Sequence, residues 1–140
     1  MTNSPLVISL ATADRRVAYD FYRALGLATP GEPADDGVPE PLQVEVGGTT
    51  IMFVPTGGFG WGLGARPVAP PGTSECILCV PFATAGEVAN FVERAEAAGA
   101  AVVTPVGDHE WGHVGTFTDP DGHLWMAMVE FRSETADEQR

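Results

Sequence analysis

The sequence of 140 residues contains no lysine, and its 7 basic residues, all arginine, face 19 acidic ones. The formal net charge is -12 at pH 7. Proteins that bind nucleic acids or anionic membrane surfaces carry a basic patch or stripe. The charge balance therefore argues against both kinds of partner and mildly favours a cationic or neutral ligand.

Long apolar runs are also lacking. A helix that spans a bilayer needs about 18 or more consecutive apolar residues, and no segment approaches this length. The beginning of the chain, MTNSPLVISL, has neither the basic start nor the long apolar stretch of a signal peptide. We expect a cytoplasmic protein, whose 44% hydrophobic residues suffice for the core of one domain.

Cysteine is scarce as well, with only Cys76 and Cys79. A small secreted domain held by disulfides usually has more. The pair lies in the apolar stretch ECILCV, which is typical of a strand, where residues three apart point to opposite faces. We therefore expect two separate thiols in the core and neither a shared metal nor a disulfide.

Two segments have the pattern of amphipathic helices. The first follows Asp14, a typical N-cap residue, and ends at Gly26. The second follows Thr84, with Glu87 at the capping-box position, and ends at Gly99. The two helices begin half a chain length apart, which points to an internal duplication.

Strand-like segments surround each helix in the same order. LVISL precedes the first helix and CILCV the second, LQVEV and TTIMFV follow the first, and AVVTPV, GTFT and HLWMAMV follow the second. The pairs Gly47-Gly48 and Asp121-Gly122 mark hairpin turns. The residues from Asp119 to Gly122 are expected to form a tight turn, because Pro120 fixes φ and glycine tolerates a positive φ.

The sequence thus predicts an α+β fold of two tandem β-α-β-β-β modules in a single domain. Module 1 covers about residues 5–56 and module 2 about residues 74–131. Residues 28–41, rich in proline, glycine and acidic residues, are expected to be a surface connection, and residues 132–140 a polar tail. The glycines and prolines of the linker at about residues 57–73 argue against a helix there.

Two segments resemble the signatures of a known superfamily. They are D-R-R-V-A-Y-D-F-Y-R-A-L-G-L, from Asp14 to Leu27, and T-D-P-D-G-H-L-W, from Thr118 to Trp125. Both are similar to the vicinal oxygen chelate superfamily, which includes glyoxalases, bleomycin-resistance proteins, fosfomycin-resistance enzymes and extradiol dioxygenases. The resemblance implies that the two modules form a curled mixed sheet around a concave pocket, and that the chain forms a homodimer with two pockets.

The resemblance also implies where a metal would bind. Metal-dependent members place His, Glu or Gln ligands on the first and last strands of each module, which correspond here to Val7, Met52, Glu75 and Met126. Divalent ions need imidazole, carboxylate or thiolate donors, and a thioether suits only soft ions such as Cu(I). Because only Glu75 supplies such a donor, we predict no metal site of the family type and no cofactor.

The string His109-Glu110-Trp111-Gly112-His113 matches the zinc-protease motif H-E-x-x-H. That motif works on a helix, where both imidazoles reach one ion. The flanking strand-like segments indicate a loop that enters a strand, where residues four apart lie about 13 Å apart at ~3.3 Å per residue. We expect Trp111 and His113 to line a pocket or a packing interface, with an irregular metal site in the loop as the alternative.

The segment from Gly58 to Gly64, GFGWGLG, is similar to glycine-rich phosphate loops. It runs into Arg66 without the helix whose N-terminus would bind the anion. A mobile flap fits better, because Phe59 and Trp61 would otherwise be unusually exposed. We expect either aromatic residue to touch a ligand, or to pack against a partner chain or the protein's own surface.

These observations favour a metal-free homodimer that binds a small, largely apolar or aromatic molecule, such as a drug or metabolite that it sequesters. The candidate pocket residues are Val7, Met52, Phe53, Phe59, Trp61, Glu75, Trp111, His113 and Met126. The alternative is a metal-dependent lyase, isomerase or dioxygenase of the same superfamily, with a non-standard ligand set such as Glu75 with His113. A scaffold protein with an empty pocket is the third possibility, and no catalytic residue is assigned.

Overall fold

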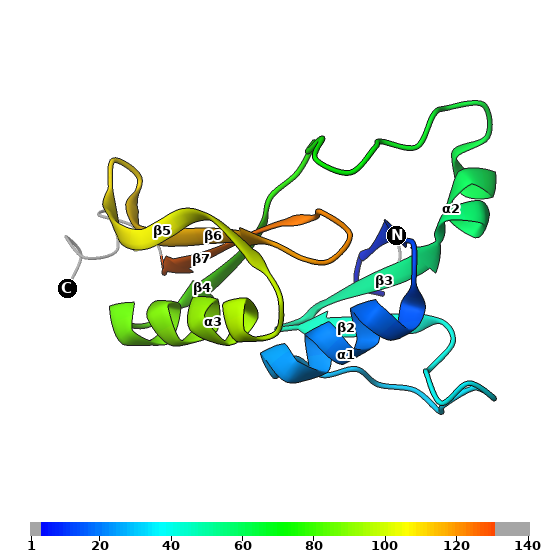
Figure 1. Ribbon diagram of the computed structural model, residues 1–140, viewed down its shortest axis with the longest axis horizontal. Coiled ribbons are helices and arrows are strands. Elements are labelled where there is room, and N and C mark those ends of the chain that lie inside the picture. The colour runs from blue at the N-terminus through cyan, green and yellow to red at the C-terminus, as the bar shows by residue number, and fades with distance from the viewer. Residues whose placement is uncertain (1–3, 131–140) are drawn as a thin grey trace.

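The chain folds into two modules, each a sheet with one helix against it. The computed structural model describes residues 4–130 (Figure 1). The elements are β1 (Val7–Thr12), α1 (Arg15–Leu25), β2 (Leu42–Val46), β3 (Thr49–Pro55), α2 (Thr56–Leu63), β4 (Leu78–Phe82), α3 (Ala85–Ala97), β5 (Ala101–His109), β6 (Gly112–Thr118) and β7 (Leu124–Val129). Within the described residues, no helix is long and apolar enough to cross a membrane.

The two sheets repeat one arrangement. The strand orders are β1-β3-β2 and β4-β7-β6-β5, and in each sheet the first and last strands of the module pair in parallel. The predicted α+β fold of two modules is confirmed. Module 1 has one strand fewer, because its connection at residues 28–41 pairs with β2 only through a bridge between Ala28 and Glu45. Prolines lack the N–H that a strand ladder needs, and this connection contains several.

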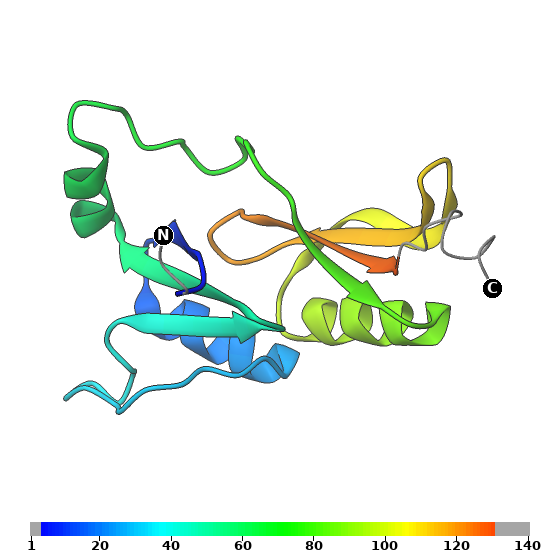
Figure 2. The ribbon, with the colours of Figure 1, turned by 180° about the vertical axis from the view of Figure 1, so that it is seen from behind.

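Helices α1 and α3 begin and end as predicted. The Asp14 side chain accepts two hydrogen bonds from backbone N–H groups of the first turn, and Thr84 accepts one from Glu87. Gly26 and Gly99 follow the helices with φ of 91° and 108°, a left-handed conformation that favours glycine. Both helices lie on the same side of the molecule, and the linker between α2 and β4 passes over the opposite side (Figures 1 and 2).

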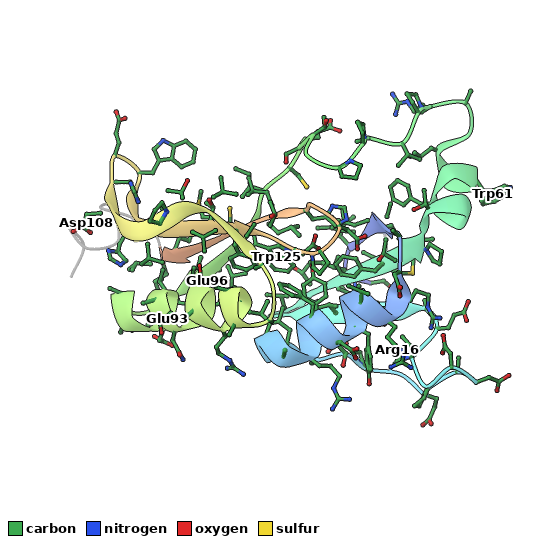
Figure 3. All side chains as sticks on the ribbon, in the orientation of Figure 1. Arg16, Trp61, Glu93, Glu96, Asp108 and Trp125 are labelled. Atoms are coloured by element: carbon green, nitrogen blue, oxygen red, sulfur yellow. The ribbon has the colours of Figure 1, made fainter. Side chains whose placement is uncertain are left out.

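One core joins the modules. Tyr22 of α1 is fully buried, with its ring centroid 4.8 Å from that of Phe53 on β3 and 5.6 Å from that of Trp125 on β7. Trp125 lies near the middle of the molecule, above the helices (Figure 3). Because Trp125 belongs to module 2, burial of the first helix depends on strand β7 of that module.

The linker contains a helix, contrary to the expectation from its glycines and prolines. Helix α2 spans Thr56–Leu63, although four of its eight residues, TGGFGWGL, are glycine. Each glycine disfavours a helix by about 1 kcal/mol relative to alanine. Contacts of α2 with β1 and β3 outweigh this weak propensity, and the prediction is wrong for this segment because it considered local composition alone.

The cysteines are not in the core. Cys76 and Cys79 are both exposed and free. Cys79 lies on β4, which is at the edge of its sheet, and Cys76 precedes that strand. The expectation of core thiols is wrong because an apolar, β-branched segment was taken as a central strand, whereas an edge strand leaves part of its surface uncovered.

Candidate functional site

A cavity of about 400 Å³ lies between the two modules. Its walls come from β1, the first turn of α2, linker residues 68–76, the first residue of β4, and residues 121–124. The volume is in the range of small-molecule sites, roughly 300–1,000 Å³. Most of the lining residues are apolar, and the two that carry a formal charge, Glu75 and Asp121, are both acidic.

Two of the predicted pocket residues line this cavity. Phe59 contributes from α2 and is half-buried, and Glu75 contributes from the linker and is exposed. Trp61, on the same helix, is 87% exposed and points away from the molecule (Figure 3). Because residues two apart in a helix do not face the same way, α2 presents Phe59 to the cavity and Trp61 to solvent.

Three other predicted residues lie elsewhere. Phe53 is in the core, where 1% of it is exposed. Trp111 lies at the turn between β5 and β6 and is 80% exposed. His113 is on β6, with its Nδ1 2.9 Å from a carboxylate oxygen of Asp108. Asp108 is at the end of the molecule far from α2 (Figure 3), so the structure does not bring this hairpin to the cavity.

The remaining three, Val7, Met52 and Met126, are strand residues outside the cavity wall. Val7 is exposed at the start of β1, Met52 is half-buried, and Met126 is 9% exposed. Chain neighbours of each methionine are core residues, so the alternation of side chains turns Met52 and Met126 away from α1 and α3. The register pairs Met52 with Ser9 and Met126 with Cys79, whereas the sequence alignment chose Val7 and Glu75.

These paired positions do not fit a divalent metal ion. They supply the hydroxyl of Ser9, the thioethers of Met52 and Met126, and the thiol of Cys79. Partial burial raises the pKa of the Cys79 thiol, which disfavours the thiolate that binds metals. The side chains therefore form no complete ligand set where the resemblance implies one.

The H-E-x-x-H string forms a hairpin. His109 ends β5 and pairs with Gly112, and Asp108 pairs with His113 across the turn. The Nε2 atom of His109 lies 2.9 Å from the backbone oxygen of Pro105. A zinc-protease site needs this motif on a helix, whereas here it lies on two paired strands and the turn between them.

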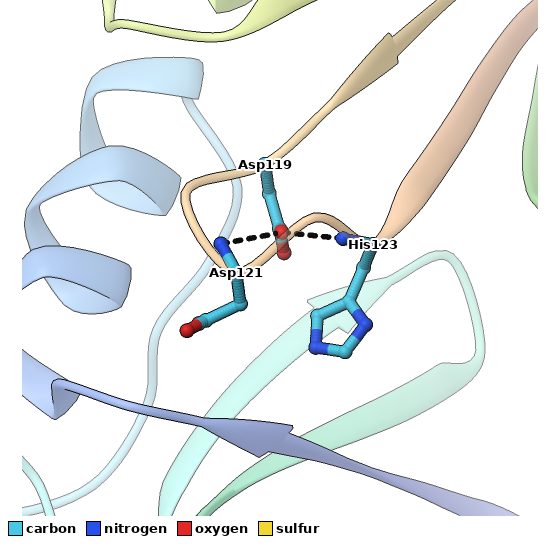
Figure 4. A group of neighbouring side chains, drawn as sticks. All are labelled: Asp119, Asp121 and His123. Carbon is cyan, nitrogen blue, oxygen red and sulfur yellow. Dashed lines mark hydrogen bonds between the residues drawn. The ribbon is translucent and has the colours of Figure 1, made fainter. Parts of the chain in front are cut away.

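One group of metal-binding side chain types converges within residues 4–130. The ligand atoms of Asp119, Asp121 and His123 lie within 4.8 Å of one another (Figure 4). Hydrogen bonds already occupy the Asp119 carboxylate, which accepts the backbone N–H groups of Asp121 and His123 at 3.0 and 2.8 Å. Its second oxygen accepts the hydroxyl of Tyr22.

The other two members of this group bind module 1. The Asp121 carboxylate accepts the Thr12 hydroxyl at 2.6 Å and the Ala13 N–H at 2.9 Å. The Nε2 atom of His123 lies 2.7 Å from the backbone oxygen of Ala11. A metal ion would have to replace these bonds, so we describe the three residues and their partners as the junction between the modules.

Burial dominates the electrostatics of the junction. It raises the pKa of Asp119, although the Tyr22 hydrogen bond opposes the rise. Burial, together with the Asp119 charge, also holds the pKa of Tyr22 well above its usual value. The Tyr22 hydroxyl therefore remains protonated and donates to Asp119, while it accepts the Trp125 Nε1–H at 3.1 Å.

The sequence predicted the turn of the junction but not the contacts of this turn with module 1. The tight turn is confirmed, because the backbone N–H of Gly122 donates to the backbone oxygen of Asp119 at 3.0 Å and Gly122 has a φ of 87°. Sequence reasoning missed Asp121 and His123 as wall residues of a cavity. The signal in the sequence was the polar segment between two apolar strands at residues 119–123. Such a segment does not reveal that its side chains bind Ala11 and Thr12 of β1.

Comparison with known proteins agrees with this architecture. A profile of the Glyoxalase/Bleomycin resistance protein/Dioxygenase superfamily matches residues 5–127. The hypothetical protein SA1046 from S. aureus has a TM-score of 0.78 and 24% identity, over 93% of this chain and 95% of its own. A glyoxalase-related enzyme from Fulvimarina pelagi has a TM-score of 0.76 and 24% identity, over 92% of this chain and 89% of its own.

An antibiotic binding protein, TnmS3 from Streptomyces sp. CB03234, has the same fold. Its TM-score is 0.60 at 22% identity, over 93% of this chain and 98% of its own. No curated protein sequence matches the chain. Since the family profile covers both modules, this chain belongs to the glyoxalase/bleomycin resistance protein/dioxygenase superfamily.

Proposed function

We propose that this protein binds and sequesters a small, largely apolar organic molecule in the cavity between its modules. The observation that carries the proposal is the cavity of about 400 Å³, with Leu10, Phe59 and Leu78 in its wall. Burial of apolar ligand surface there contributes about 25 cal/mol per Å² before the costs of association. The acidic lining residues and the net charge of -12 favour a neutral or cationic ligand over an anionic one.

The side chains support binding more than metal chemistry. Ser9, Met52, Cys79 and Met126 supply no carboxylate or imidazole at the paired strand positions. Glu75 and His113, the non-standard pair that a lyase, isomerase or dioxygenase would use, do not converge in a metal-binding group within residues 4–130. TnmS3 is an antibiotic binding protein, which supports a binding role for this fold.

The test of this proposal compares two aromatic residues of α2. Titration with pyrene, followed by its fluorescence, is expected to give an affinity about tenfold weaker for Phe59→Ala, since the variant loses apolar contact with the ligand. Trp61→Ala is the matched control and should change the affinity less than about twofold, because Trp61 is 87% exposed on the other side of α2. Equal losses in both variants, or no binding to the wild type, would contradict the proposal.

The proposal includes a homodimer. Leu6, Val7 and Ile77, which lie in or beside the edge strands β1 and β4, are 77%, 48% and 42% exposed. Apolar residues along an unpaired strand edge favour association with another chain. Analytical ultracentrifugation is expected to give twice the mass of one chain, and Val7→Lys, which adds a charge to this edge, should shift the equilibrium toward monomer.

We also propose that the protein is cytoplasmic. Both cysteines are free, which is typical of a reducing compartment.

A further inference from the structure

His123 is a half-buried polar residue in the cavity wall, and one of its ring nitrogens is held by the protein. The Nε2 atom lies 2.7 Å from the backbone oxygen of Ala11. Figure 4 shows the imidazole pointing from the turn toward β1. A carbonyl oxygen only accepts hydrogen bonds, so Nε2 carries the hydrogen and Nδ1 of the neutral ring carries a free lone pair.

The Nδ1 atom of His123 has no hydrogen-bond partner within residues 4–130. This nitrogen is also accessible. Among residues 4–130, the side-chain nitrogen or oxygen atom that is both fully buried and without a hydrogen-bond partner is Nε of Arg15, and Nδ1 of His123 does not belong to that class. The space that His123 lines is the cavity. The ring is also fixed in place, since its centroid is 6.0 Å from that of Phe53 and its Nε2 is bound to Ala11.

Other polar groups of the wall are less suited to hold a ligand. The Asp121 carboxylate already accepts hydrogen bonds from the Thr12 hydroxyl and the Ala13 N–H at the end of β1. The Thr56 hydroxyl donates to the backbone oxygen of Thr12 at 3.3 Å. Glu75 and the remaining hydroxyl-bearing residues of the wall are exposed, so water competes for them. His123 is therefore a wall acceptor that is unoccupied, oriented and partly shielded from water.

We propose that Nδ1 of His123 accepts a hydrogen bond from the ligand and orients it in the cavity. The ligand class is then an apolar organic molecule that carries an O–H or N–H donor, such as a polycyclic phenol. This inference rests on the proposed function, because it requires a ligand in the same cavity. A site with a shielded acceptor rejects an analogue that lacks the donor, since the acceptor then loses its bond to water without gaining another.

The experiment uses hydroxypyrene and its methyl ether, which differ in the donor and share the apolar body. We expect the wild-type protein to bind hydroxypyrene about tenfold more tightly, the effect of one hydrogen bond to a shielded acceptor. Fluorescence titration measures both affinities. Equal affinities would overturn the assignment of His123 while leaving the proposed function intact, whereas no binding of pyrene or either derivative would overturn both.

Two substitutions separate the role of Nδ1 from that of Nε2. His123→Gln places an amide N–H near the position of Nε2, so it keeps the bond to Ala11 and removes the Nδ1 acceptor. Its affinity for hydroxypyrene should fall about tenfold, to that of the methyl ether, with an unchanged melting temperature. His123→Asn places an amide oxygen near Nδ1 and loses the Ala11 bond, so it should keep the preference and melt at a lower temperature. A preference retained in His123→Gln would overturn the inference.

Discussion

Tyr22→Phe is expected to lower the free energy of unfolding by about 3–5 kcal/mol, although it removes a single oxygen atom. The hydroxyl donates to the Asp119 carboxylate and accepts the Trp125 Nε1–H. Tyr22 is 0% exposed, Trp125 1% and Asp119 5%, so water cannot replace the lost partner. Each unsatisfied buried group costs about 1–3 kcal/mol, and a charged group costs more.

The matched control is Tyr19→Phe on the same helix. The Tyr19 hydroxyl accepts one exposed hydrogen bond from Arg23 at 3.1 Å, so its loss should change the stability by less than about 0.5 kcal/mol. Urea unfolding followed by circular dichroism measures both variants. If the two substitutions had similar effects, the Tyr22 hydroxyl would not hold the junction.

The cost of Tyr22→Phe should also grow with pH. Burial raises the pKa of Asp119 and the Tyr22 bond opposes this rise, so the variant has an Asp119 pKa higher still. When a carboxyl has a higher pKa in the folded protein than in the unfolded chain, the folded protein loses stability as the pH rises between these two pKa values. Above both values the loss of stability stays constant. This loss of stability is larger in the variant, so its difference from the wild type should be smaller near the ordinary carboxyl pKa of 3.8 than at about pH 7.

Gly115→Ala is expected to destabilise the protein by about 2–3 kcal/mol through overpacking. A Cβ at this position would lie 2.5 Å from Cγ2 of Val106 and 3.3 Å from Cγ2 of Val92. Val106 is on β5 and Val92 on α3, so strand and helix both close over the backbone of β6 at this glycine. The β5–β6 register shifts between Thr104 and Gly107, which marks β5 as irregular here.

The control for this prediction is Gly48→Ala in the β2–β3 turn. A Cβ at Gly48 meets nothing within 4 Å, so the effect should stay within about 0.5 kcal/mol. Adding Val106→Ala to Gly115→Ala removes the closest side-chain atom and should recover part of the loss. Thermal unfolding of the four proteins measures these effects, and a Gly115→Ala variant as stable as Gly48→Ala would refute the close packing.

The parts of the fold that local patterns determine were predictable. The caps at Asp14 and Thr84, and the stop at Gly26, depend on residues next to one another in the chain. Helix α2 was missed because its glycines disfavour a helix locally, while the contacts that stabilise it come from β1 and β3. The exposure of Cys79 was missed for a similar reason, since strand order places β4 at an edge.

The candidate site was less accessible to sequence reasoning. Phe59 was chosen as an aromatic residue of the glycine-rich segment and Glu75 from the family resemblance, and both line the cavity. The wall at His123 depends on a turn from module 2 that contacts β1, and no local pattern encodes that contact. Trp61 could not be separated from Phe59 until α2 was known to be helical, because only then do the two face different sides.

The hydrogen bonds of the junction have a consequence for how the protein is made. They join residues 97, 103, 109 and 112 positions apart, the last being Ala11 and His123. Ribosomes add about 5–20 residues per second, so Tyr22 is synthesised seconds before Trp125. The nascent N-terminal module lacks the ring that covers its aromatic residues until Trp125 has been synthesised. Module 1 therefore completes its core after synthesis of β7, and chains interrupted before β7 expose apolar surface to chaperones and proteases.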